Sequence, residues 1–160
     1  MLFRSLVGAP DELPIEENFT GNSLHYNWDT NGGLGVDTDT SDGDGSALKL
    51  YNNGNSADVF FVLPKVNLNP AGNPTLMFDV KAGVGVDKVI AYGAVAGGEA
   101  VDLAEFNVTD EYTTVKAPLN SIKGGAYASV GIRANIPTAS LQQYEDYVLI
   151  DNIKIVDLLE

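Results

Sequence analysis

Hydrophobic and polar positions alternate with a period of two along most of the chain. In the run 75–81, for example, Leu76, Phe78 and Val80 alternate with Met77 and two charged residues. Such alternation is typical of a strand with one buried face and one solvated face. An apolar stripe with helical spacing is not sustained over three turns anywhere in the sequence. The pattern therefore predicts an all-β protein.

The strands that this pattern predicts are short and separated by turns rich in Gly, Pro and Asn. They cover residues 15–19, 24–28, 47–51, 59–63, 75–81, 88–95, 112–119, 127–134 and 147–156. A single turn of helix is expected, at 140–144. Nine short strands in 160 residues favour two antiparallel sheets packed face to face as one β-sandwich. We expect the module to occupy residues 14–157, preceded by a linker or leader over residues 1–13.

Two carboxylates fall on positions that the alternation assigns to the interior. Counting along the strand 147–156 places Asp151 on the same face as Ile153, and Glu17 falls on the apolar face of the strand 15–19. An isolated carboxylate in an apolar interior costs several kcal/mol or more. Each acid must therefore be paired, protonated or bound to a metal ion, unless its strand is irregular.

A shared calcium ion explains both acids. If the first and last strands are neighbours, Glu17 and Asp151 come together, and like charges at short range ionise jointly only with a cation between them. Calcium accepts six to eight oxygen ligands at flexible angles, and Asn18 and Asn152 are neighbouring sources of carbonyl oxygens. The alternative is a bulge in one strand that turns its acid to solvent.

A second group of acids, Asp37, Asp39, Asp42 and Asp44, lies in one loop. Carboxylates at alternate positions can face one ion, but the loop does not match an EF-hand. Started at Asp37, that pattern needs Gly at the sixth position and Glu at the twelfth, where this chain has Asp42 and Leu48. We interpret the segment as a solvated, flexible loop, with a second cation site as the alternative.

Composition narrows the classes of function. The chain has 22 acidic and 9 basic residues, and this charge of -13 disfavours nucleic acid and anionic membrane surfaces as partners. Apolar runs long enough to span a membrane are absent from the sequence. Without cysteine, and with His25 as the only histidine, there is no Cys-His chemistry and no serine-triad motif. These features favour a protein without catalytic activity.

Aromatic residues offer a different chemistry, because an exposed ring can stack on a sugar ring beside polar side chains. The candidates are Trp28, Tyr51 and Tyr92. The alternative is that each of these rings belongs to the core or its rim.

Several short motifs occur in an order that carries a family resemblance. They are EENF at 16–19, Trp28, VFFVLPKVNL at 59–68, TLMF at 75–78, SVGIR at 129–133 and IDNIKI at 150–155. Over about residues 14 to 156 the chain resembles the cleaved-adhesin or choice-of-anchor J family, a jelly roll related to MAM and galactose-binding-like sandwiches. In such jelly rolls one acid of the opening strand and one of the closing strand bind structural calcium, and Glu17 and Asp151 match these positions. The chain lacks the family's Asp-Gly-Asp-Gly run close behind Trp28; its own run comes later, at 42–45.

The resemblance implies a non-catalytic adhesion or binding module of a larger surface or secreted protein, of the type found in Bacteroidetes. Its expected partners are a glycan or a host or matrix protein, together with other domains of the same polypeptide. Its expected location is extracellular or on the cell surface, associated with the outer membrane. The alternative is a carbohydrate-binding module attached to a glycan-degrading enzyme.

Overall fold

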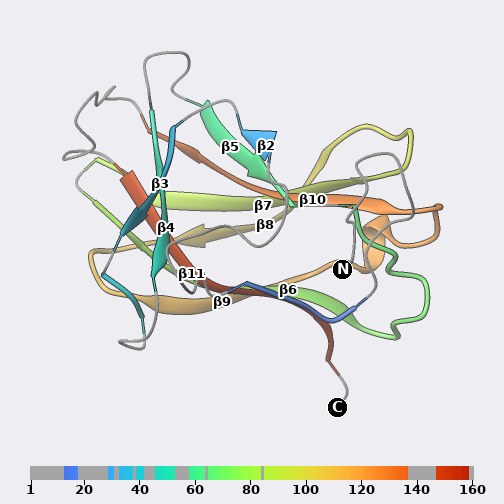
Figure 1. Ribbon diagram of the computed structural model, residues 1–160. Helices are drawn as coiled ribbons and strands as arrows, with labels where there is room; N and C mark the ends of the chain where they lie inside the picture. Colours follow the sequence, from blue (N-terminus) through green and yellow to red (C-terminus); the bar gives the residue numbers. More distant parts are fainter. Residues whose placement is uncertain are drawn as a thin grey trace, which may run out of the picture.

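Two antiparallel sheets form the molecule, which confirms the predicted all-β sandwich (Figure 1). The computed structural model describes residues 13–17, 29–30, 33–37, 39–41, 46–52, 58–63, 65–83, 85–136 and 147–158. The six-stranded sheet has the order β3 (Gly33–Asp37), β4 (Ala47–Tyr51), β11 (Tyr147–Asp157), β6 (Pro74–Ala82) and β9 (Thr113–Pro118), with β1 (Ile15–Glu17) also paired to β11. The five-stranded sheet has the order β2 (Asp29–Thr30), β5 (Asp58–Val62), β10 (Ala128–Asn135), β7 (Lys88–Val95) and β8 (Val101–Asn107).

The hydrophobic core lies between the sheets and is built by the alternation seen in the sequence. In β6, Leu76, Phe78 and Val80 are fully buried, whereas Met77 and Asp79 are half-buried on the other side. Strand β10 repeats the pattern in the opposite sheet. The side of each sheet turned away from the core is called its outer face below.

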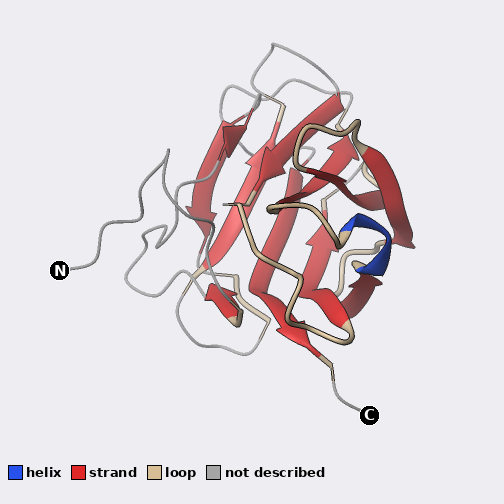
Figure 2. Ribbon diagram, turned by 90° about the vertical axis from the view of Figure 1, so that its right-hand side faces the viewer, coloured by secondary structure: helices blue, strands red, loops and turns tan. Residues whose placement is uncertain are grey.

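Helical structure in the described residues is limited to short turns such as η2 (Asn120–Ile122), which lies at one edge of the sandwich (Figure 2). The part of the chain that the structure describes contains no helix long and apolar enough to cross a membrane.

The first and last strands are neighbours, as the calcium hypothesis requires. Strand β1 pairs with β11 in antiparallel register, with Ile15 opposite Ile155 and Glu17 opposite Ile153. Strand β4 pairs with the preceding part of β11, from Tyr147 to Ile150. Strands β4 and β1 therefore follow one another along β11.

A β-bulge interrupts β11 on the side that pairs with β6. Asp151 lies opposite Asp79, but the next pair joins Lys154 to Met77, so β11 has one extra residue at this point. Asn152 takes up the distortion with a φ of 49°, in the left-handed region. The extra residue reverses the alternation along the strand.

The predicted strands agree closely with those observed, although three observed strands were not predicted. The predicted bounds of β4 and β7 match the structure, the predicted start of β1 matches while its predicted end at residue 19 lies outside the described residues, and the bounds of the other described predictions differ by one residue. The sequence pattern missed β2, β3 and β8. The predicted strand 24–28 and the helical turn at 140–144 lie outside the described residues.

Candidate functional site

A pair of carboxylates occupies the outer face of the six-stranded sheet. Asp79 of β6 and Asp151 of β11 are directly opposite each other in the strand register, so their side chains share a face. Asp151 has 0% of its surface exposed, although it lies outside the core. Lys154 and Asn152 come from the same stretch of β11 and complete the polar surroundings.

The bulge corrects the sequence-based placement of Asp151. Simple alternation put this acid on the same face as Ile153, but the extra residue in β11 turns Ile153 toward the core and leaves Asp151 on the outer face, so that placement was wrong. The alternative prediction was a bulge that exposes the acid to solvent, and only the bulge itself is confirmed. The bulge exists, and yet Asp151 is buried.

Ser41, in the connection between β3 and β4, binds the carboxylate pair. The backbone N–H of Ser41 donates to Asp151 Oδ2 at 3.0 Å. The Ser41 hydroxyl lies 2.7 Å from Asp79 Oδ2 and 3.2 Å from Asp151 Oδ2. A hydroxyl has one hydrogen to donate, so it links the two carboxylates by serving them alternately.

Asn152 and Thr114 donate further hydrogen bonds to the pair. The backbone N–H of Asn152 donates to Asp151 Oδ1 at 2.8 Å. Its side-chain Nδ2 lies 3.1 Å from Asp79 Oδ2 and 3.1 Å from the Ser41 hydroxyl oxygen. The Thr114 hydroxyl of β9 donates to Asp79 Oδ1 at 2.5 Å. The carboxylates are thus surrounded by donors that belong to strands β9 and β11 and to the 39–41 segment.

The balance of these contacts keeps Asp79 ionised. Burial raises the pKa of Asp79, but hydrogen bonds from Thr114, Ser41 and Asn152 and the positive charge of Lys154 together lower that pKa below its ordinary value. The group is consequently a carboxylate at neutral pH.

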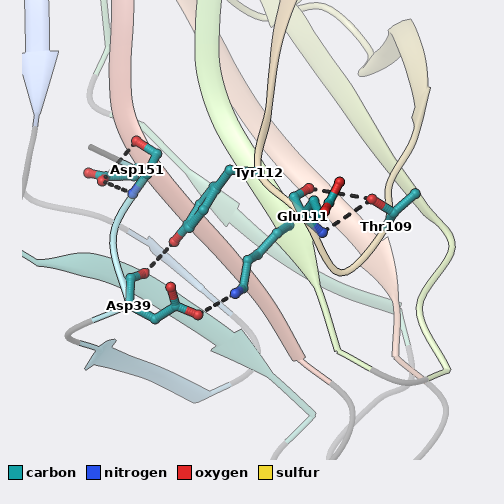
Figure 3. Close-up of polar contacts among 7 residues, drawn as sticks. Asp39, Thr109, Glu111, Tyr112 and Asp151 are labelled. Carbon is teal, nitrogen blue, oxygen red and sulfur yellow. Dashed lines mark hydrogen bonds and ion pairs between the residues drawn. The ribbon is translucent and has the colours of Figure 1, made fainter. Parts of the chain in front are cut away.

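Asp39 is anchored to the same face by two contacts (Figure 3). The Tyr112 hydroxyl donates to the Asp39 backbone oxygen at 2.5 Å, and the Asp39 carboxylate forms an ion pair with Lys81. Tyr112 follows a turn in which the backbone N–H of Glu111 donates to the Thr109 hydroxyl oxygen at 3.2 Å. The described part of the acid-rich loop is therefore attached to the sheet at Asp39, whose side chain is still exposed.

The remaining predicted cation ligands lie wholly or partly beyond the described structure. Asn18, Asp42 and Asp44 are outside the described residues, and Glu17 and Asp37 are described only as backbone. The backbone of Glu17 pairs with Ile153, two residues from Asp151.

The oxygen atoms at the carboxylate pair are of the kind that calcium binds, but the described residues supply fewer than the six to eight ligands that calcium takes. Asp79, Asp151 and the Ser41 hydroxyl offer the hard oxygen ligands that calcium prefers. Among the described residues, however, no three acidic or histidine side chains gather closely enough to hold a metal ion. Further ligands would have to come from residues such as Glu17 and Asn18.

A hollow of about 290 Å³ opens beside the carboxylate pair. It is lined by Met77, Phe78, Asp79, Thr114, Asn152 and Lys154. Sequence reasoning did not single out Asp79 or Ser41. The signal for Asp79 was its position among the solvated residues of the strand 75–81, but only the register across the bulge places it beside Asp151.

A second polar and aromatic surface lies on the outer face of the five-stranded sheet. Tyr92 of β7 and Phe60 of β5 meet edge to face, with ring centroids 6.5 Å apart. Between these strands runs β10, where Gly131 lies opposite Tyr92 and Arg133 lies opposite Phe60. We call Phe60, Tyr92, Gly131 and Arg133 the Tyr92 platform.

Gly131 allows the Tyr92 ring to lie close to the sheet. A Cβ at this position would lie 2.7 Å from the Tyr92 Cζ and 2.8 Å from the Phe61 backbone oxygen. Real Cβ atoms do not approach other atoms so closely, so any side chain here would displace the ring. The glycine therefore fixes the position of Tyr92 on this face.

Arg133 supplies the charge of the platform and is held by two acids. Its Nη2 donates to both carboxylate oxygens of Asp102, each at 2.8 Å, and its Nη1 lies 3.6 Å from Asp58. The hydrogen bond to Asp102 raises the pKa of Arg133 above its ordinary value. A guanidinium fixed in this way has a defined direction in which its remaining N–H groups can donate.

The three aromatic candidates do not form one site. Tyr92 belongs to the platform, whereas Tyr51 of β4 is opposite Tyr147 on the outer face of the other sheet. Trp28 lies outside the described residues. Sequence reasoning did not single out Gly131 or Asp102, because their roles depend on which strands are neighbours in the five-stranded sheet.

Comparisons with known proteins show the fold. No protein-family model matches the chain, and no curated protein matches it in sequence. Among solved structures, it is similar to the K1 cleaved adhesin domain of Lys-gingipain from Porphyromonas gingivalis W83, with 13% identity and a TM-score of 0.64 over 92% of this chain and 99% of that domain. It is also similar to TmCBM61 in complex with β-1,4-galactotriose, with 16% identity and a TM-score of 0.61 over 88% and 94% of the two chains.

An enzyme contains the same fold as one of its parts. An exo-β-agarase matches with 13% identity and a TM-score of 0.68 over 89% of this chain, but the match covers only 24% of the enzyme. The structures similar to this chain are mostly binding modules, either free or within larger proteins.

Proposed function

We propose that this chain is a non-catalytic carbohydrate-binding module that holds its ligand on the Tyr92 platform. The observation that carries the proposal is the combination of a partly buried aromatic ring with a fixed guanidinium and a carboxylate beside it. A sugar presents an apolar ring face and a rim of hydroxyl groups. Tyr92 suits the first, and Arg133 and Asp102 suit the second as donor and acceptor.

The comparisons support the same class of function. TmCBM61, which shares the fold, was solved with β-1,4-galactotriose bound. The fold also forms part of an exo-β-agarase, which fits a module that accompanies a glycan-degrading enzyme. We further propose that the module is extracellular or located on the cell surface and that the same polypeptide contains other domains.

A truncation of the platform tests the proposal. Tyr92→Ala removes the stacking ring and should weaken binding of β-1,4-galacto-oligosaccharides or other neutral β-linked glycans by about tenfold or more, measured by titration calorimetry after a glycan array identifies a ligand. Tyr51→Ala is the matched control, because it removes the same side chain from the outer face of the other sheet, and it should bind as the wild type does. Loss of binding in the Tyr51 variant alone would refute the platform as the site.

Adhesion to a host or matrix protein is the second candidate. It is favoured by the similarity to the cleaved adhesin domain, which covers nearly the whole length of both chains. An array on which no glycan binds, together with saturable binding to a purified matrix protein, would favour adhesion over carbohydrate recognition.

We also propose a structural calcium ion at the carboxylate pair, held by Asp151 and Glu17 with help from Asn18 and Asn152. The burial of Asp151 next to ionised Asp79 supports the need for a cation. The backbone of Glu17 pairs with Ile153, which faces the core, so binding of one ion by both acids requires the chain after β1 to leave the regular strand alternation. Calcium bound there would neutralise the two carboxylates and join the first strand to the last. A second ion at Asp37, Asp39, Asp42 and Asp44 stays a hypothesis.

A further inference from the structure

The charges on the outer face of the five-stranded sheet are already paired. Arg133 is bound by Asp102 and lies near Asp58, and Lys88 lies 3.5 Å from Glu105. Both of these cations therefore have acidic partners on this face. The chain as a whole carries a net charge of -13.

The arrangement affects neutral and anionic ligands differently. An anionic sugar, such as a uronate or a sulfated hexose, would need a cation of its own. The positive charge of Arg133 is already matched by Asp102, which accepts two hydrogen bonds from Nη2. The anionic sugar would also approach Asp58 and Asp102, whose like charge repels it. A neutral sugar has no such conflict, because its hydroxyl groups donate to these carboxylates and accept from the guanidinium.

The two acids thus act on the specificity of the platform through Arg133. With Asp102 in place, the guanidinium is neutralised and oriented as a hydrogen-bond donor. Without Asp102, Arg133 would keep only the longer contact with Asp58, and its positive charge would be less fully neutralised. That is a favourable setting for a carboxylate or a sulfate.

We infer, on the basis of the proposed carbohydrate-binding function, that the Tyr92 platform selects uncharged glycans and that Asp102 and Asp58 enforce this selection by neutralising Arg133 and repelling anionic sugars.

The test compares two oligosaccharide series of equal length on the full chain by titration calorimetry. One is a neutral β-1,4-galacto-oligosaccharide, and the other is the same oligosaccharide oxidised to uronates at C6. The wild type should bind the neutral series more tightly, by on the order of tenfold or more at low salt. Added salt should reduce this preference, because it screens the repulsion between exposed charges.

Asp102→Asn should bring the two affinities toward equality by strengthening binding of the oxidised series. Asp58→Asn, a second variant in case the first folds poorly, should shift the ratio in the same direction by a smaller factor, because Asp58 lies farther from the guanidinium. Glu99→Gln, in the exposed turn between β7 and β8, removes one carboxylate away from the platform and should leave the ratio unchanged.

The outcomes separate this inference from the proposed function. Equal wild-type affinity for the two series, or an unchanged ratio in both Asp variants, would overturn the selection by charge while leaving carbohydrate binding intact. A wild type that binds neither series nor any glycan on an array would refute the carbohydrate-binding function itself, and the selection with it.

Discussion

At the scale of single residues, Gly131 determines the geometry of the Tyr92 platform. The backbone of β10 is in contact with the ring because there is no side chain between them. The same position is confined on its other side by the Phe61 backbone oxygen, so neither neighbour can move away cheaply. A methyl group at this residue would therefore affect both stability and the position of the ring.

We expect Gly131→Ala to destabilise the protein by about 1–3 kcal/mol, because it overpacks a site that has no free space. It should also weaken glycan binding by displacing Tyr92. Urea unfolding measures the first effect, and titration with the ligand of the wild type measures the second. Gly72→Ala is the control, since nothing lies within 4 Å of a Cβ at that position, and its stability should be close to that of the wild type. Equal stability of the two variants would show that β10 can adjust.

At the scale of elements, the bulge in β11 determines where the carboxylate pair lies. One extra residue places Asp151 beside Asp79 while keeping Ile150 and Ile153 in the core. The φ of 49° at Asn152 makes this possible, and asparagine tolerates that conformation better than β-branched residues do. The Asn152 amide also binds Ser41 and Asp79, so the residue has a conformational role and a bonding role.

Two substitutions at this position separate the roles. Asn152→Gly keeps the left-handed conformation and loses only the amide contacts. Asn152→Val loses both, and we expect it to be less stable than Asn152→Gly by about 1–3 kcal/mol in urea unfolding. The same loss of stability in both variants would mean that the backbone conformation at the bulge contributes little.

The sequence pattern predicted the strands in which apolar and polar side chains alternate clearly. It missed the strands that lack this alternation and depend on hydrogen bonds from a neighbouring strand. Strands β4, β6 and β7 have apolar residues at every second position, and all three were predicted. Strand β3 contains Gly33 and Gly35, and β8 has exposed acids at Asp102 and Glu105, so neither shows that pattern. They form because a neighbouring strand supplies hydrogen bonds.

The candidate sites were predicted in part for the same reason. Alternation correctly indicated that Asp151 is unusual, but it cannot reveal an extra residue within a strand, and so the face was wrong. Tyr92 was among the candidate contacts. Its partners Gly131 and Arg133 come from β10, and no local pattern shows that β10 lies next to β7.

At the scale of the whole molecule, the excess of acids has consequences for stability. A net charge of -13 on 160 residues opposes compaction through mutual repulsion, and the buried carboxylate adds to that repulsion. A bound divalent cation would reduce both effects, and it would stabilise the folded state because it binds that state alone.

We therefore expect EDTA to lower the melting temperature and calcium to raise it, with a gain of about 2.7 kcal/mol when free calcium is 100 times its Kd. Asp151→Asn and Glu17→Gln should each abolish the response to calcium. Glu99→Gln, which removes an exposed acid from the turn between β7 and β8 in the other sheet, should keep it. A wild-type melting temperature that is indifferent to both EDTA and calcium would rule out the ion.

The pairing of β1 with β11 determines how the module responds to mechanical tension. Because Ile15 lies opposite Ile155 in an antiparallel pair, a pull on the two ends of the chain acts on the same end of the two strands. Their hydrogen bonds then break one after another instead of sharing the force. Among the described residues, three residue pairs hold β1, so this strand should peel away first under load, and Glu17 would move away from Asp151 before the sandwich itself opens.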